Sequence, residues 1–308
     1  VALPGINPVI PLGWGALAFI VALVIHEYGH GLQARAHGMR IRSFGLLQLG
    51  PLPLGAFAEP QYEELTNAPS RERMRMFAAG PATNIFAAII CLMFLGGLAS
   101  QFVATEDGVH VRGIVQDEGA YQAGLQPWDT IQFIDGQEIS DIDAFYDTME
   151  GYSANDTIAL TVKHSDGQVE TLNATLSDKY DYYLELGWSK GNLESIGVEE
   201  GQPFLGVEGL SGGTAGIDRL AGPLSPRWDG NLAQKSVMAP LHTLSLMIVP
   251  FELQGVAMHP FEESLLEAED NVFAQTLGTS GLLFFVNLFF WLLWVNILLG
   301  FTNLIPMV

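Results

Sequence analysis

Two histidines and a glutamate, His26, Glu27 and His30, are the residues whose types and spacing are best suited to chemistry. Residues four positions apart on a helix lie on the same face, about 6 Å from each other. His26 and His30 can therefore both direct a ring nitrogen at one metal ion, as the two histidines of an H-E-x-x-H helix do for zinc. Glu27 lies beside them, where it can accept a proton from water. The spacing predicts a metal site with His26 and His30 as ligands and Glu27 as the catalytic base.

This motif ends a strongly apolar run. The first 25 residues contain no charged side chain, and residues 13–25 have the composition of a membrane-spanning helix. A surface helix would have one polar face, whereas this segment is apolar on all sides until His26. Ionisable groups at membrane depth are costly and are generally functional. The setting therefore favours a metal site over a chance match of the motif on a solvated helix.

Apolar segments of membrane-spanning length recur later in the chain. Of the 308 residues, 49% are hydrophobic, and the mean hydropathy of +0.26 is high for a soluble protein. Residues 76–105 and 271–308 carry no charge, and each run can hold a spanning helix of about 20 residues. A weaker uncharged run, residues 236–251, is interrupted by two prolines. The composition predicts a polytopic α-helical membrane protein, with spanning helices over residues 13–33, 74–100 and 282–299.

The charged residues are mostly acidic. A net charge of −21 results from 34 acidic and 13 basic side chains. A surface this acidic repels nucleic acid, so we expect no nucleic-acid partner. Only four of the bases are lysine, which suggests adaptation to high salt in a halophilic prokaryote; an ordinary solvated acidic domain explains the composition equally well.

The arginines predict how the chain is oriented in the membrane. Six of the nine lie between the first two predicted spanning helices or at the very start of the second, at positions 35, 40, 42, 71, 73 and 75. Positive residues in short loops stay on the cytoplasmic side. We therefore expect a multi-pass protein of the cell membrane in which this loop is cytoplasmic and the following soluble region is extracytoplasmic.

Residues 44–58 of that loop are apolar and contain several helix breakers. The segment is too apolar for a solvated loop and too short to span the membrane as a helix. Irregular backbone at membrane depth persists only where protein or a wet cavity covers it. We predict a re-entrant β-hairpin near the metal, whose strand edge could pair with an extended substrate segment. A hydrophobic loop on the surface is the alternative.

The soluble region resembles a PDZ domain over about residues 103–178. The family's run A-x-x-A-G-L-x-x-x-D-x-I-x-x-I-D-G is matched by Ala120, Ala123, Gly124, Leu125, Asp129, Ile131, Ile134, Asp135 and Gly136. A small helix is expected around residues 120–123, a second helix over residues 141–149, and alternating strands over residues 158–162 and 169–174. The resemblance implies that a peptide or a C-terminal tail docks by strand addition; a spacer that binds nothing is the alternative.

Four parts follow along the chain. Residues 1–102 form the first part of the membrane core, with the zinc-site helix, the re-entrant loop and the second helix. Residues 103–178 form an inserted soluble α+β PDZ-like domain. Residues 179–235, rich in Gly, Ser and Pro, are expected to form an irregular extracytoplasmic extension. Residues 236–308 form the second part of the membrane core.

Catalytic zinc takes three protein ligands and keeps one position open, and the motif provides only two. Five other histidines are present, at positions 37, 110, 164, 242 and 259. Two of them, His110 and His164, belong to the soluble region, and His37 borders the arginine-rich loop, where it is expected to face water. His242 and His259 flank the weak apolar run, where they could contact substrate; their position alone gives little support for a ligand role. The residues by themselves leave the third ligand open.

Three motifs, in order, resemble those of the site-2 protease family of intramembrane zinc metalloproteases. They are H-E-x-x-H at residues 26–30, G-P-x-x-N at residues 80–84 and N-x-x-P at residues 303–306. The resemblance covers nearly the whole chain and implies one Zn²⁺ per chain. It also implies that Asn84 and Asn303 bind the substrate backbone or the developing oxyanion, although hydrogen bonding between helices is an alternative for both.

The family's third ligand is the aspartate of an L-D-G segment that follows the last motif. In this chain that position would come just after Val308. We therefore expect the third ligand, an Asp, beyond Val308, with the given sequence truncated before it.

The function that this resemblance implies is an intramembrane zinc endopeptidase for regulated intramembrane proteolysis. It would cleave the transmembrane segments of single-span membrane proteins within the lipid bilayer. One alternative is a catalytically dead, membrane-anchored PDZ adaptor, which the missing aspartate would favour. Another is a soluble zinc peptidase with a signal anchor, which the three uncharged helical runs disfavour.

Overall fold

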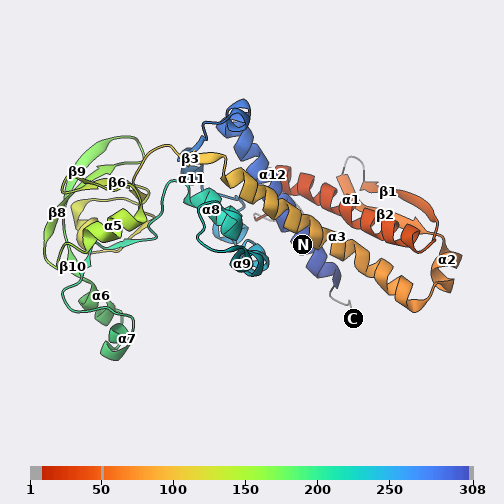
Figure 1. Cartoon of the computed structure of the whole chain (residues 1–308), viewed down its shortest axis with the longest axis horizontal. Helices are drawn as coiled ribbons and strands as arrows, with labels where there is room; N and C mark the ends of the chain where they lie inside the picture. Colours follow the sequence, from red (N-terminus) through yellow and green to blue (C-terminus); the bar gives the residue numbers. More distant parts are fainter. Residues whose placement is uncertain (1–8, 50–51, 305–308) are drawn as a thin grey trace. The chain divides into compact units, whose positions relative to one another are not determined.

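The structure, a computed structural model, describes residues 9–49 and 52–304 (Figure 1). The chain divides into two compact units. One, here called the helical unit, comprises Val1–Phe102, Gly216–His259 and Ala268–Val308. The other, here called the β-rich unit, comprises Val103–Ala215 and Pro260–Glu267.

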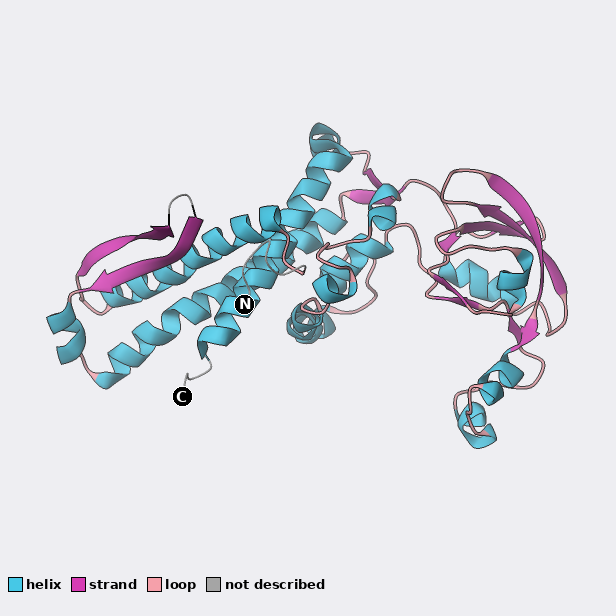
Figure 2. Ribbon diagram, turned by 180° about the vertical axis from the view of Figure 1, so that it is seen from behind, coloured by secondary structure: helices cyan, strands magenta, loops and turns pink. Residues whose placement is uncertain are grey.

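Three long helices form the helical unit: α1 (Leu12–Ala36), α3 (Ser70–Ala99) and α12 (Val272–Leu304). Each is long and apolar enough to cross a membrane, as the sequence predicts. Helices α1 and α12 extend beyond the predicted bounds at both ends, whereas α3 begins four residues before its predicted start and ends one residue before its predicted end. Helix α3 packs against both α1 and α12 (Figure 2).

Small residues let these helices approach closely. A Cβ atom on Gly300 of α12 would lie 2.9 Å from the Ile85 side chain and 3.3 Å from the Pro81 carbonyl oxygen of α3. Glycine at such crossings is typical of packing in membranes, where van der Waals contact stabilises helix pairs. The G-P-x-x-N segment of α3 therefore lies at the α12 crossing.

Between α1 and α3 the chain forms an antiparallel hairpin of β1 (Ile41–Leu49) and β2 (Leu52–Pro60), followed by the short α2 (Tyr62–Asn67). Strand β2 packs against α1. The predicted loop is thus a β-hairpin; its depth in the membrane stays a prediction.

The rest of the helical unit follows the β-rich unit in sequence: α8 (Ala215–Ala221), η1 (Gly222–Leu224), α9 (Leu232–Ser245) and α10 (Val249–Glu252). Arg227 donates to the carbonyl oxygens of Ala99 at 2.9 Å and Phe102 at 3.2 Å, which caps the end of α3. The weak apolar run of residues 236–251 lies in α9 and α10, which are shorter than a spanning helix.

The β-rich unit is built on a five-stranded antiparallel sheet. Four strands follow the order β4-β6-β8-β9, and β7 pairs with β6. Their bounds are Val109–His110 (β4), Thr130–Ile134 (β6), Gln137–Glu138 (β7), Thr157–Lys163 (β8) and Val169–Thr175 (β9). Helices α4 (Gly119–Ala123) and α5 (Ile142–Met149) complete the predicted pattern. Alternating residues such as Ile158, Leu160 and Val162 are fully buried in the core.

Short strand pairs complete this part of the chain. They are β5 (Gly113–Ile114) with β12 (Val207–Glu208), β10 (Ser177–Asp178) with β11 (Pro203–Phe204), and β3 (Phe102–Ala104) with β13 (Leu266–Ala268). Helix α11 (Pro260–Ser264) precedes β13 and packs Phe261 against Trp128 at a ring separation of 5.2 Å.

The segment after residue 178 is more ordered than the predicted irregular extension. It contains α6 (Lys179–Glu185) and α7 (Lys190–Ser195). Asp178 and Ser189 cap these helices through their side chains, a signal that the high content of Gly, Ser and Pro obscured. Residues 179–215 belong to the same compact unit as the PDZ-like domain, whereas the domain boundaries predicted from the sequence remain predictions.

Candidate metal centre

Helix α1 brings the two histidines of the motif together. The Nε2 atoms of His26 and His30 lie 3.1 Å apart, and ligand atoms of His26, Glu27 and His30 all lie within 4.8 Å of one another. Two nitrogens on a tetrahedral zinc ion are roughly 3.3 Å apart, given Zn–N bonds of about 2.0–2.1 Å. The side chain of His26 is buried, with 8% of the residue exposed. The donor types and their separation therefore fit zinc.

The carbonyl group of Met76 on α3 orients His30. It lies 2.7 Å from His30 Nδ1, which donates the hydrogen bond. A ring held in this way carries its proton on Nδ1 and leaves the Nε2 lone pair free for a metal. The sequence did not point to Met76, because the contact involves its backbone and any residue type could make it.

Gly80 leaves the space in which the histidine nitrogens meet. A Cβ atom at this position would overlap the Nε2 atoms of both His26 and His30. On the facing helix, a Cβ atom on Gly29 would lie 2.9 Å from the Ala79 carbonyl oxygen. The glycine of the G-P-x-x-N motif thus leaves room for the site, a role that the sequence analysis missed.

The hairpin contacts the predicted base. The backbone N–H of Ala58 on β2 donates to Glu27 Oε2 at 2.9 Å. A carboxylate at this position is therefore held by a strand edge and lies beside the two histidines. This contact supports a role for the hairpin near the site.

The two predicted asparagines differ. Asn84 is fully buried on α3, and neither polar atom of its side chain has a hydrogen-bond partner among the described residues. Asn303 is exposed on α12 and donates to the Leu299 carbonyl oxygen at 2.9 Å. The last two residues of the N-x-x-P motif, and the aspartate expected beyond Val308, lie outside the described residues. Asn84 therefore has free hydrogen-bonding capacity, whereas the Asn303 amide is engaged within its own helix.

Asn296 is a further buried asparagine, which the sequence analysis did not single out. Its Nδ2 donates to the Leu292 carbonyl oxygen at 2.8 Å, but Oδ1 has no partner in the described part of the chain. It lies one turn before Gly300, where α12 meets α3. An amide in a segment as apolar as residues 271–308 was a usable sequence signal.

The other histidines do not join the site. His37 contacts Gln33 at 3.1 Å, and His242 lies near the Leu220 carbonyl oxygen at 3.4 Å. Within residues 9–49 and 52–304, the His26, Glu27 and His30 group is the only cluster of three potential ligands. The structure therefore adds no third ligand from the five remaining histidines.

Two of those histidines, His110 and His164, lie in the β-rich unit and contact its own side chains. Burial lowers the pKa of His110 to about 4, although Glu106 opposes the shift. His164 Nδ1 donates a hydrogen bond to Asp129 Oδ1 at 2.9 Å, which raises the pKa of His164. His110 is fully buried with Nδ1 bonded to Thr130 at 2.7 Å, which is the environment of a core histidine.

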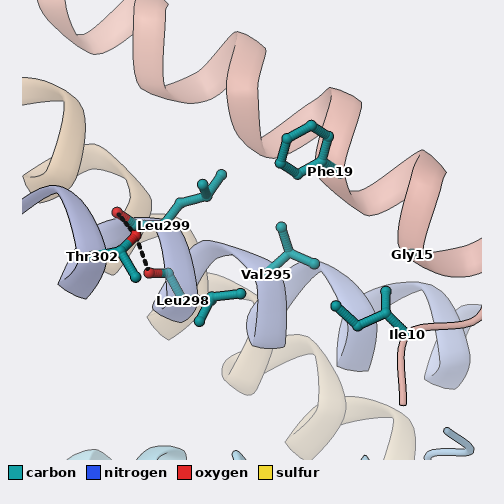
Figure 3. Close-up of a pocket in the computed structure, with 7 residues that line it drawn as sticks. All are labelled: Ile10, Gly15, Phe19, Val295, Leu298, Leu299 and Thr302. Carbon is teal, nitrogen blue, oxygen red and sulfur yellow. Dashed lines mark hydrogen bonds between the residues drawn. The ribbon is translucent and has the colours of Figure 1, made fainter. Parts of the chain in front are cut away.

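A small apolar cavity lies between α1 and α12, on the side of α1 that precedes the motif. Its volume is about 140 Å³, and it is lined by Ile10, Gly15, Phe19, Val295, Leu298, Leu299 and Thr302 (Figure 3). The Thr302 hydroxyl donates to the Leu298 carbonyl oxygen at 2.8 Å. The lining offers no metal ligand, so this cavity is separate from the chemical site.

The family of the chain follows from a sequence comparison. The pattern of peptidase family M50 matches residues 14–308, which include the three motifs. The chain belongs to peptidase family M50. Membership confirms the resemblance to the site-2 proteases that the motifs indicated.

Curated relatives match over shorter stretches. An uncharacterized protein of Methanocaldococcus jannaschii is 31% identical over 137 residues, which cover 44% of this chain and 35% of that protein. A "Putative zinc metalloprotease" of Neisseria meningitidis is 30% identical over 41% of this chain and 34% of the relative. The regulator of sigma-E protease RseP of Salmonella typhimurium is 28% identical over 42% of this chain and 35% of the relative. The chain thus spans about a third of the length of these relatives.

Solved structures match part of the chain. The PDZ domain of an SdrC-like protein from Listeria innocua is 26% identical, with 33% of this chain and 92% of that chain covered and a TM-score of 0.25. The corresponding domain from Listeria monocytogenes is 24% identical, also with a TM-score of 0.25.

Proposed function

We propose that the chain is the core of an intramembrane zinc endopeptidase that cleaves transmembrane segments of single-span membrane proteins. The observation that supports this most strongly is the pair of Nε2 atoms of His26 and His30, 3.1 Å apart, with Glu27 beside them. Three helices of membrane-spanning length and membership of family M50 agree with it. A dead adaptor would have no need to keep this geometry.

His26 and His30 would hold one Zn²⁺ per chain, with the predicted aspartate beyond Val308 as the third ligand. When bound, zinc supplies Lewis-acid chemistry that makes water more acidic. Glu27 accepts a proton from the attacking water and later returns it to the leaving amine. The Ala58 N–H keeps that carboxylate oriented toward the histidines. The unpartnered amide of Asn84 can bind a substrate carbonyl oxygen, and Asn303 is the second candidate for this role.

The remaining parts fit a substrate that arrives within the lipid bilayer. A peptide bond is open to attack only where a transmembrane helix unwinds, and the edge of the β1–β2 hairpin can hold such a segment extended. The PDZ-like domain, on the extracytoplasmic side, would bind a peptide or a C-terminal tail. The biological role would be regulated intramembrane proteolysis in the cell membrane of a halophilic prokaryote.

Substitution of Glu27 by Gln tests this proposal. The variant keeps the shape of the side chain and both histidines, so we expect it to retain zinc and lose cleavage of a single-span reporter protein by at least about a hundredfold. Glu63→Gln, an exposed change on α2, is the matched control and should cleave normally. Full cleavage by Glu27→Gln would refute the assignment of the base.

A further inference from the structure

The β-rich unit contains an open groove beside a strand edge. Strand β12 pairs with β5 on one side, and its other edge pairs with no strand among the described residues. A groove of about 750 Å³ runs between β12 and α5. Its apolar lining includes Phe145 and Met149 from α5 and Leu205 and Val207 from the β12 side. An unpaired strand edge next to apolar side chains is suited to an extended peptide.

The extension after residue 178 forms one wall of this groove. Lys179, Glu199 and Glu200 line it from the segment that contains α6 and α7. That segment has a small core of its own, formed by Tyr180, Leu193 and Val198. The wall is therefore a packed structure.

Contacts fix this wall at both of its ends. Asp178 accepts hydrogen bonds from the N–H groups of Tyr180 at 2.9 Å and Gly201 at 2.8 Å. The Lys179 N–H donates to the Gln202 carbonyl oxygen at 2.9 Å. Since Glu199 and Glu200 directly precede these anchored residues, their backbone is fixed beside the groove that they line.

The charges on the groove are mostly negative. Glu150, Glu199 and Glu200 are exposed, and none of them forms an ion pair within the described residues. Lys179 is the single basic side chain of the lining. Three carboxylates against one ammonium group attract a cationic ligand and repel an anionic one.

We propose that this groove selects an extended peptide segment with apolar side chains and a basic side chain that lies next to Glu199 and Glu200. The α6–α7 extension is then a specificity-determining part of the molecule. Peptides with acidic residues at the same position are excluded by repulsion. The inference rests on the peptide-binding role proposed above for the PDZ-like domain.

Binding of labelled peptides to the purified full chain in detergent tests this inference. The probe is a nine-residue peptide of alternating valine and threonine, blocked at both termini, with lysine, glutamine or glutamate at both ends. At low salt we expect the lysine peptide to bind about tenfold more tightly than the glutamate peptide, because exposed ion pairs each contribute about 0.2–1 kcal/mol. The preference should weaken as salt is added.

Two double variants locate the source of the preference. Glu199→Gln with Glu200→Gln should reduce it to about threefold or less, since it removes two of the three carboxylates. Glu138→Gln with Glu194→Gln changes the net charge equally, but both residues are exposed and neither lines the groove. This control should keep the full preference.

Three results would overturn the inference. They are equal binding of the three peptides to the unmodified chain, loss of the preference in the control, and an unchanged preference in the Glu199 and Glu200 variant. Absence of any peptide binding also overturns it. Zinc content and reporter cleavage, measured on the same preparation, show separately whether the proposed peptidase function stands.

Discussion

At the scale of single residues, the site depends on the space left between α1 and α3 as much as on the side chains that these helices supply. His26 and His30 meet at their Nε2 atoms because Gly80 has no side chain to fill the space between α1 and α3. The Met76 carbonyl group then fixes the orientation of His30. A ligand pair, a backbone acceptor and a missing Cβ atom together define the position that we assign to zinc.

Replacement of Gly80 by Ala should therefore damage the site directly. The added Cβ atom would overlap both histidine nitrogens, so we expect zinc affinity to fall by about tenfold or more, the loss typical of changes next to metal ligands. Competition with a chromogenic chelator measures this affinity. Gly97→Ala on the same helix is the control, since a Cβ atom there meets no neighbour within 4 Å. Equal zinc affinity in the two variants would show that Gly80 does not shape the site.

At the scale of secondary structure, the β1–β2 hairpin contacts the site through a hydrogen bond to Glu27. The Ala58 N–H reaches Glu27 on α1 at 2.9 Å, and β2 is the strand that packs against α1. The same hairpin is our candidate for holding an unwound substrate. It would then orient the base and the peptide bond together.

Ala58→Pro removes this hydrogen bond, because proline has no N–H. A hydrogen bond to a charged group contributes about 1.5–3 kcal/mol, so we expect the cleavage rate constant to fall by roughly tenfold or more while zinc content is unchanged. Ala56→Pro, two residues earlier on the same strand, is the control because strand residues repeat with a period of two. If both variants lose activity equally, the effect comes from the strand and not from the Glu27 contact.

The elements also show how far sequence reasoning extends. Charge-free runs predicted the three long helices, and an apolar segment with helix breakers predicted the hairpin. The PDZ motif and the alternating strands predicted the sheet of the PDZ-like domain. The helices α6 and α7 were missed, because short capped helices in a segment rich in Gly and Ser have no clear periodicity.

For the site, the spacing of residue types in the sequence was enough to predict that His26, Glu27 and His30 lie together. The contributions of Met76, Gly80 and Ala58 come from a backbone group or from an absent side chain. Such contributions depend on how helices and strands pack, which the spacing of residue types does not encode.

At the scale of the whole molecule, two compact units have different compositions. The helical unit carries the arginine-rich segment between α1 and α3, while most acidic residues follow residue 105. This asymmetry is the basis for the predicted topology, with residues 34–73 in the cytoplasm and the PDZ-like domain outside.

Single cysteines test that topology. Ser165→Cys lies in an exposed turn of the β-rich unit, and Asn67→Cys lies at the exposed end of α2. In intact cells, a maleimide reagent that cannot cross membranes should label position 165 and not position 67, and both should react after lysis. The native Cys91 is buried and provides the background. Labelling of position 67 in intact cells would reverse the orientation.

The most direct test of the account is the zinc content of the purified protein, measured by mass spectrometry of the metal. We predict one zinc ion per chain in the unmodified protein and in a His37→Ala control. The His26→Ala with His30→Ala variant should contain less than about a tenth of that amount, because two of the three expected ligands are gone. An equal zinc content in this variant, or no zinc in the unmodified protein, would contradict the claim that His26 and His30 form a zinc site.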